Sequence, residues 1–182
     1  MTCSKTKQLY ILEWYGPYNS SEEMESKAGI NDCSVYLITG QNKYSRNNSK
    51  CQVIYVGMTK RVVPKRIIEK DHIEKQANYK NKQFWAAKFS NISNNNPEAH
   101  ARLVESCLIR FLSLAGAPLI NKQGTRKNPK SDVAVVSRWN KKFSEEGRYN
   151  KSSKLWWLSD VILYQNEKFW FSEKIYKLYV ES

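Results

Sequence analysis

Residues 34–57 read SVYLITGQNKYSRNNSKCQVIYVG, and the fold expected for the chain is built outward from this stretch. Two apolar, β-branched runs, 35–38 and 53–56, flank a polar interval rich in Asn, Ser, Lys and Arg. This pattern predicts two antiparallel strands joined by a loop. Each run carries one tyrosine, Tyr36 and Tyr55, and antiparallel pairing can bring both onto one face. Either tyrosine alone is more typical of a half-buried strand aromatic.

The composition is that of a folded protein large enough to bury a core. The chain has 182 residues, of which 41% are apolar and 13% aromatic, so we expect a single domain over 1–182. No run reaches transmembrane length and the first residues lack a signal-peptide core, so a cytoplasmic protein is expected. The four cysteines show no metal-ligand or disulfide spacing and are interpreted as reduced thiols.

The charge is strongly positive and unevenly distributed. Thirty basic residues against seventeen acidic ones give a formal charge of +13. Residues 41–82 and 122–154 hold the excess, so the basic character is local and one basic segment overlaps the tyrosine hairpin. Such an excess predicts a polyanionic partner: nucleic acid by default, or an anionic membrane surface as the alternative.

The remaining segments have simpler patterns. Residues 7–15 predict a strand ended by Gly16-Pro17, and Asn19 begins a short predicted helix through Lys27. A helix is expected from Pro64 to about Lys80, a strand over 84–89, and a helix from the Asn96-Pro97-Glu98 cap to Gly116. Basic residues 122–154, punctuated by Trp139, are interpreted as a DNA-facing loop region whose central 133–139 could be a strand. The aromatic tail, residues 155–180, is expected to close the core against the N-terminal strand, with base stacking as the alternative.

Four later residues could carry chemistry beside the tyrosines. Arg66 falls in the first turn of a predicted helix, where the backbone amides and the guanidinium group can bind a phosphate. The alternative is that Arg66 belongs to a basic rim that is only solvated. Glu105 lies on the apolar face of a helix, where a carboxylate is costly unless it binds a cation or forms a salt bridge, for example to Arg102. Asn121 follows that helix, and His72 is a secondary candidate that is more often an ordinary surface residue.

In this order the residues resemble the GIY-YIG nuclease family. SVYLI stands for the first motif, IYVG for the second, Arg66 for the arginine that follows, Glu105 for the metal-binding glutamate and Asn121 for the terminal asparagine. The resemblance covers about residues 33–121. Ser34-Val35 replaces the Gly-Ile of the family name, and Arg66 falls one position later than expected, so Lys65 and Arg61 remain alternative cations.

The resemblance implies an α+β fold: a small antiparallel three-stranded sheet flanked by helices over 33–121, with 1–32 and 122–182 as elaborations for core closure and DNA contact. It also implies metal-dependent hydrolysis of a DNA phosphodiester. Glu105 would hold Mg²⁺ or Mn²⁺, and Arg66 would stabilise charge on the phosphate. Tyr36 would be the general base if nearby cations favour its phenolate, Tyr55 would position water or phosphate, and Asn121 would brace the site.

The short flanks favour a stand-alone, sequence-specific type II restriction endonuclease acting on double-stranded DNA. Such an enzyme would be expected to act as a homodimer on a short palindrome, with a monomer that cuts one strand at a time as the alternative. The alternatives are a homing or repair enzyme, a nonspecific toxin-like nuclease, and a nucleic-acid-binding protein without catalysis. The residues predicted to contact DNA are basic and lie in the two basic segments: Lys43, Arg46, Lys60, Arg61, Lys122, Arg126 and Lys127.

Overall fold

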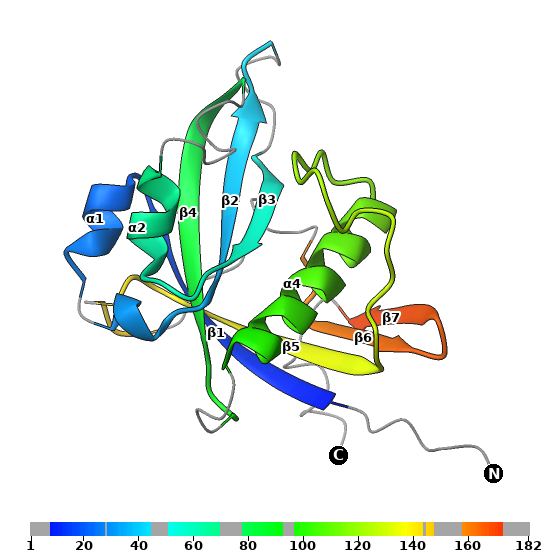
Figure 1. Cartoon of the computed structure of the whole chain (residues 1–182). Helices are drawn as coiled ribbons and strands as arrows, with labels where there is room; N and C mark the ends of the chain where they lie inside the picture. Colours follow the sequence, from blue (N-terminus) through cyan, green and yellow to red (C-terminus); the bar gives the residue numbers. More distant parts are fainter. Residues whose placement is uncertain are drawn as a thin grey trace.

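The computed structural model describes residues 8–27, 29–44, 51–69, 78–92, 97–143, 145–147 and 158–172. Its strands form one seven-stranded mixed sheet in the order β3-β2-β4-β1-β5-β6-β7, which is strongly curled (Figure 1). The strands are β1 (Gln8–Tyr18), β2 (Val35–Asn42), β3 (Gln52–Met58), β4 (Tyr79–Phe89), β5 (Val133–Asn140), β6 (Val161–Gln165) and β7 (Lys168–Ser172). The helices described are α1 (Ser21–Glu25), the 3₁₀ turn η1 (Ile30–Asp32), α2 (Val63–Ile68) and α4 (Pro97–Leu114).

The expected fold class, a small three-stranded sheet flanked by helices, is wrong. The three strands of that sheet are present as the antiparallel neighbours β3-β2-β4, but they form only one end of a larger sheet. The N-terminal segment supplies β1, the middle strand, which pairs antiparallel with β4 and parallel with β5. Both flanks of the predicted core are therefore part of the sheet. β1 pairs with β4 along one side and with β5 along the other, and β6 and β7 follow β5.

Several predicted boundaries also change. β1 continues through Gly16-Pro17, and its pairing with β4 shifts register between Tyr15 and Tyr18. Its parallel pairing with β5 ends at Tyr15, so the missing N–H of Pro17 costs no ladder bond on that side. β4 begins at Tyr79 inside the region expected to be helical, and α2 is described only to Ile68. By contrast, α1, α4 and β5 form where the sequence predicts them.

The sheet separates two apolar clusters. α4 packs on one face over residues of β1, β2, β4 and β5, and buries Val104, Cys107 and Leu108 completely. α1, η1 and α2 cover the other face, where Tyr36 and Ile67 are buried. None of the described helices is long and apolar enough to cross a membrane.

Two expectations about aromatic residues are wrong. Trp139 belongs to the core and not to a DNA-facing loop: it is 5% exposed and stacks on Trp14, with ring centroids 5.3 Å apart. In the tail, Phe169 packs against the core, but Trp170 and Phe171 are 61% and 63% exposed. Phe171 nevertheless lies against Phe111 of α4, with ring centroids 5.6 Å apart. Trp156, Trp157 and Tyr176 lie outside the described residues.

Candidate active site

Within the described part of the chain, the outer edge of β3 is bonded by the segment after α4 and by side chains, and not by another strand. Alternate backbone groups on such an edge need partners. The backbone N–H of Ile120 donates to the Ile54 carbonyl oxygen (2.8 Å). Asn121 then pairs twice with Val56: its Nδ2 donates to the carbonyl oxygen (2.7 Å), and its Oδ1 accepts from the backbone N–H (3.1 Å). These bonds lie on both sides of Tyr55 and fix the segment after α4 against it.

Glu105 approaches the same edge from α4. Its Oε1 accepts a hydrogen bond from the backbone N–H of Met58 (3.0 Å). The side chain is half-buried, and burial raises the pKa of this carboxyl, an effect partly offset by the Met58 N–H and by Arg102 and Arg66. Within the described part of the chain Glu105 forms no ion pair, because Arg102 binds Glu98 instead, through Nη2 at 2.7 Å. Among the described residues, Glu105 therefore does not form the salt bridge that the sequence left open as the alternative to a bound cation.

Tyr36 and Tyr55 lie on one face, as their positions require. Tyr36 is paired with Gly57, two residues beyond Tyr55, so both side chains project toward the side covered by α2, with ring centroids 5.9 Å apart. Opposite Ile38 the pairing of β3 shifts by one residue, which leaves Ile54 as an extra residue beside Tyr55.

Gly57 provides the space that the Tyr36 ring occupies. A Cβ at position 57 would lie 2.5 Å from Cζ of Tyr36, 2.6 Å from its hydroxyl oxygen and 2.8 Å from Cε1. Ordinary carbon contacts are about 3.5–4.0 Å, so only glycine fits beneath the ring. Gly57 lies inside β3, so this close approach, and not an exit from the strand, explains the glycine of the IYVG motif.

The two phenols have unequal environments. Tyr36 is fully buried, and burial is the main reason that its pKa is raised, with a further increase from the neighbouring Tyr55. Tyr55 is half-buried; burial raises its pKa too, but its hydrogen bond with Tyr36 acts in the opposite direction. The bond thus favours the proton on Tyr36 and makes Tyr55 the easier phenol to ionise.

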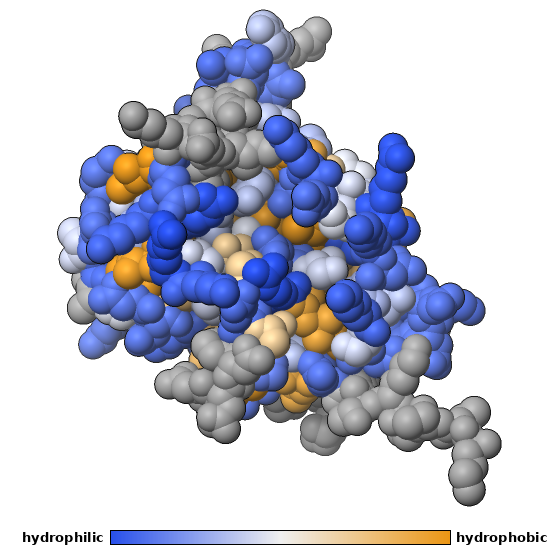
Figure 2. Space-filling view, viewed as in Figure 1, coloured by the Kyte–Doolittle hydropathy of each residue, from blue (hydrophilic) through white to orange (hydrophobic). Residues whose placement is uncertain are grey.

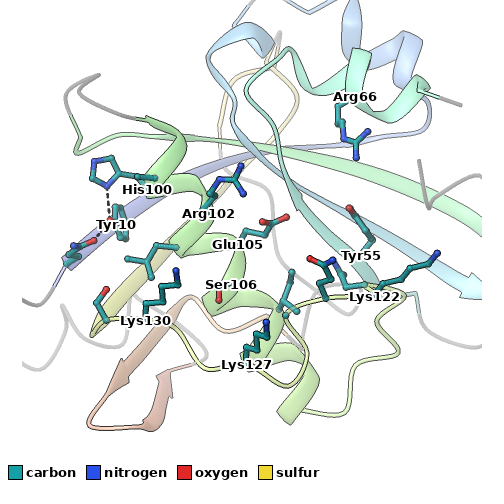
Figure 3. A pocket seen from close by; sticks show the side chains of 18 residues that line it. Tyr10, Tyr55, Arg66, His100, Arg102, Glu105, Ser106, Lys122, Lys127 and Lys130 are labelled. Carbon is teal, nitrogen blue, oxygen red and sulfur yellow. Dashed lines mark hydrogen bonds between the residues drawn. The ribbon is translucent and has the colours of Figure 1, made fainter. Parts of the chain in front are cut away.

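Arg66 is the basic residue of α2 that reaches this site (Figure 3). Its guanidinium interacts electrostatically with both tyrosines and with Glu105. It also forms an ion pair with Glu69, whose other carboxylate oxygen lies 2.8 Å from Nη1 of Arg61. Burial opposes the charge of Arg66, but the bond to Glu69 and the two phenols together raise its pKa.

These groups line one cleft of about 930 Å³ that runs along α4. The cleft holds a single carboxylate, that of Glu105, among five Lys and Arg side chains: Arg66, Arg102, Lys122, Lys127 and Lys130. In the space-filling view hydrophilic side chains border this region, and small apolar areas show between them (Figure 2). The balance of charge suits an extended polyanion with one reactive position.

The structure brings most of the predicted catalytic set together. Tyr55, Arg66, Glu105 and Asn121 line the cleft, and Tyr36 lies behind Tyr55. Among the residues predicted to contact DNA, Lys122 and Lys127 line it. Five other predicted basic residues do not line it: Lys43, Lys60, Arg61, Lys65 and Arg126. His72 and Arg46 lie outside the described residues.

Several lining residues were not predicted. His100, Arg102 and Ser106 lie on the same helix as Glu105, and helical spacing from that glutamate could have identified only Arg102, three residues earlier. Lys130 follows the predicted Lys127 by three residues in the same basic segment. Gln8 and Tyr10 come from β1, and no local pattern connects that strand to the cleft.

The donor set fits a single hard cation bound mainly through water and phosphate. No group of three or more His, Cys, Asp or Glu that could hold a metal occurs among the described residues. Among the described residues that line the cleft, Glu105 alone offers a carboxylate. Mg²⁺ keeps several waters and takes one or two carboxylates plus substrate phosphate, so one glutamate is a sufficient protein ligand. No family model, curated protein or solved structure matches this chain.

Proposed function

We propose that this protein is a divalent-metal-dependent endonuclease that hydrolyses phosphodiester bonds in DNA, related in its motif order to the GIY-YIG nucleases. The observation that carries the proposal is the convergence of Tyr55, Arg66, Glu105 and Asn121 at one end of a basic cleft. These residues are separated by up to 66 positions in the sequence and come from β3, α2, α4 and the segment after α4. Structural packing alone does not require a lone carboxylate, two phenols and an arginine to meet.

Glu105 is the proposed ligand of one Mg²⁺ or Mn²⁺. When bound, the ion would neutralise charge on the scissile phosphate and its leaving oxygen. The Met58 N–H donates to Oε1 and so fixes the carboxylate at the wall of the cleft, where it could hold the ion. Burial raises the pKa of Glu105, so a bound cation would also relieve the cost of its charge.

Tyr55 is the proposed group that accepts the proton of the attacking water. The sequence suggested Tyr36 for this role, but Tyr36 is fully buried and does not line the cleft, whereas Tyr55 does. A base must reach its proton directly or through one water. Tyr36 would then act through Tyr55, because its hydrogen bond stabilises the Tyr55 phenolate. Arg66 lies close enough to both phenols to favour the same ionisation.

Arg66 is the proposed cation that stabilises the phosphate during attack. It is favoured over Arg61 and Lys65 because it lines the cleft and they do not. Glu69 holds Arg66 in the free protein, and a phosphate could take over the same planar, charge-assisted hydrogen bonds. Asn121 touches neither phosphate nor water in this scheme; it positions Tyr55 through its two bonds to Val56.

At the finer level we propose a sequence-specific type II restriction enzyme in the cytoplasm, acting on double-stranded DNA as a possible homodimer. Homing, repair and toxin-like nucleases share the same chemistry. A nucleic-acid-binding protein without catalysis would also use the basic cleft, but it would not need Glu105 or the two tyrosines.

Incubation of the whole protein with supercoiled plasmid and phage DNA tests the proposal. With Mg²⁺ we expect cutting that EDTA abolishes, and discrete fragments whose ends map to one short sequence. A smear would support a nonspecific nuclease over a restriction enzyme. Salt-sensitive binding without cutting under any divalent metal would favour the binding protein and overturn the nuclease.

A further inference from the structure

The cleft extends beyond the proposed catalytic groups to a second, chemically different end. Near the start of α4 it is lined by His100, and from the neighbouring β1 by Gln8 and Tyr10 (Figure 3). None of these side chains carries a formal charge at pH 7 when histidine is neutral. The apolar side chain of Leu103 adjoins them along the cleft. This end therefore differs from the cationic part beside Glu105.

A chain of hydrogen bonds sets the polar atoms at this end. The Tyr10 hydroxyl donates its single proton to Oε1 of Gln8. The hydroxyl oxygen of Tyr10 lies 2.8 Å from Nδ1 of His100. Because the Tyr10 proton is already donated to Gln8, this oxygen accepts the proton of Nδ1. Neutral His100 is thereby left with Nε2 as an acceptor, and Gln8 is left with its amide N–H₂ as a donor. An adjacent donor and acceptor is the arrangement that reads the edge of a nucleobase. The Tyr10 ring is 2% exposed and packs against Phe89, so it supports this arrangement from the core.

One wall of the cleft carries lysines that no acidic residue neutralises. Lys122, Lys127 and Lys130 have no ion pair within the described part of the chain. Across the cleft, Arg66 and Arg102 are paired with Glu69 and Glu98. The three lysines are therefore free to hold phosphates without first breaking an existing ion pair.

The spacing along α4 suits one strand of nucleic acid. His100 precedes Glu105 by five residues, a rise of about 7.5 Å along a helix. That distance is about two steps of stacked bases at roughly 3.4 Å each. A volume of about 930 Å³ is far too small for a duplex but accommodates a short piece of single strand.

We propose that the Gln8, Tyr10 and His100 end of the cleft binds one unpaired nucleobase, about two nucleotides from the phosphate at Glu105, while Lys127 and Lys130 hold the intervening backbone. The placement relative to Glu105 rests on the proposed nuclease function. The base subsite itself rests on the hydrogen-bond chain and the unpaired lysines. A paired base must leave its stack to enter, so the substrate is opened locally or is single-stranded at this position.

Proton NMR of the whole protein without divalent metal tests the subsite independently of cleavage. The chain has only two histidines, and the His100→Gln variant identifies the His100 ring signal. The probes are the single-stranded tetranucleotides of dA, dC and dT, an abasic tetramer with the same phosphates, and a blunt duplex of twelve base pairs. We expect the tetranucleotides to shift the His100 signal and to bind at least about fivefold more tightly than the abasic tetramer, equivalent to about 1 kcal/mol for the contacts of one base.

Lysine variants test the wall by the salt dependence of binding. Lys127→Ala and Lys130→Ala should each weaken tetranucleotide binding and lower the slope against log[salt] by about 0.7, the value for one contact to a single strand. Lys168→Ala removes an equal charge outside the cleft and should leave both quantities unchanged.

Four results would overturn the subsite: equal His100 shifts from the abasic tetramer, which indicate an anion site only; equal shifts from the duplex; binding without any His100 shift; or no binding. Cleavage by a protein that fails this test would leave the nuclease proposal intact. If the His100 signal shifts but the protein never cuts DNA, the nuclease proposal is refuted and the base subsite is supported.

Discussion

Substitution of Gly57 by alanine tests the packing that brings the two tyrosines together. The added Cβ would lie 2.5–2.8 Å from three atoms of the Tyr36 ring, Cζ, Cε1 and the hydroxyl oxygen. Contacts of about 3.5–4.0 Å are required, so the ring or the strand must move by about 1 Å. Tyr36 is fully buried and cannot rotate into solvent without opening the cluster under α2. Overpacking of this kind costs about 1–3 kcal/mol of unfolding free energy.

A double-mutant cycle separates this clash from other effects. Tyr36→Leu keeps an apolar side chain but lacks the three atoms that the new Cβ would meet. In that background Gly57→Ala should be neutral or stabilise by about 0.5–1 kcal/mol, because alanine is favoured over glycine inside a strand. Urea unfolding of the four proteins gives the coupling, which we expect to be at least about 1 kcal/mol. An equal cost of Gly57→Ala in both backgrounds would refute the account of Gly57.

Three further predictions concern the edge of β3. Tyr55→Phe should lower the single-turnover cleavage rate by about 10²–10⁴-fold, the usual contribution of a general base, and Tyr36→Phe by less; the reverse order would return the base to Tyr36. Burial raises the pKa of Glu105, so folding favours its protonated form, and its ionisation costs stability as the pH rises through 4.5 towards the raised value. Glu105→Gln keeps the acceptor for Met58 and should therefore raise the urea midpoint at pH 7.5, with the gain disappearing below about pH 4; a lower midpoint at pH 7.5 would contradict the burial argument. Asn121→Ala leaves both backbone groups of Val56 unpaired and should cost about 1–3 kcal/mol of unfolding free energy; no loss would mean that water replaces the amide.

The positions of the proposed catalytic groups were largely predictable because each carries a local signal. Tyr55, Glu105 and Asn121 lie in segments whose patterns predicted β3, α4 and the end of that helix. Choosing Arg66 over Lys65 and Arg61 required the structure, in which Arg66 lines the cleft and the other two residues do not. The roles of the tyrosines also depended on burial, which strand periodicity does not reveal when both faces of a sheet are covered.

The architecture was less predictable because it depends on nonlocal pairing. Nothing within residues 8–18 specifies that β1 lies between β4 and β5 and carries the sheet past three strands. The His100 end of the cleft has the same origin: Tyr10 of β1 meets a histidine ninety residues later only because β1 runs beside the start of α4. Trp170 and Phe171 were expected to be buried because of the aromatic content of the tail, but both are exposed.

The most direct test of the central claim is single-turnover cleavage of supercoiled plasmid by Glu105→Gln in Mg²⁺. Glu98→Gln is the matched control, because Glu98 lies on the same helix but outside the cleft, paired with Lys60 and Arg102. We predict that Glu105→Gln binds DNA as the unmodified protein does without metal, yet cuts at least about a hundredfold more slowly, whereas Glu98→Gln cuts at nearly the full rate. Cutting by Glu105→Gln at the unmodified rate would contradict the assignment of this cleft as a metal-dependent nuclease site.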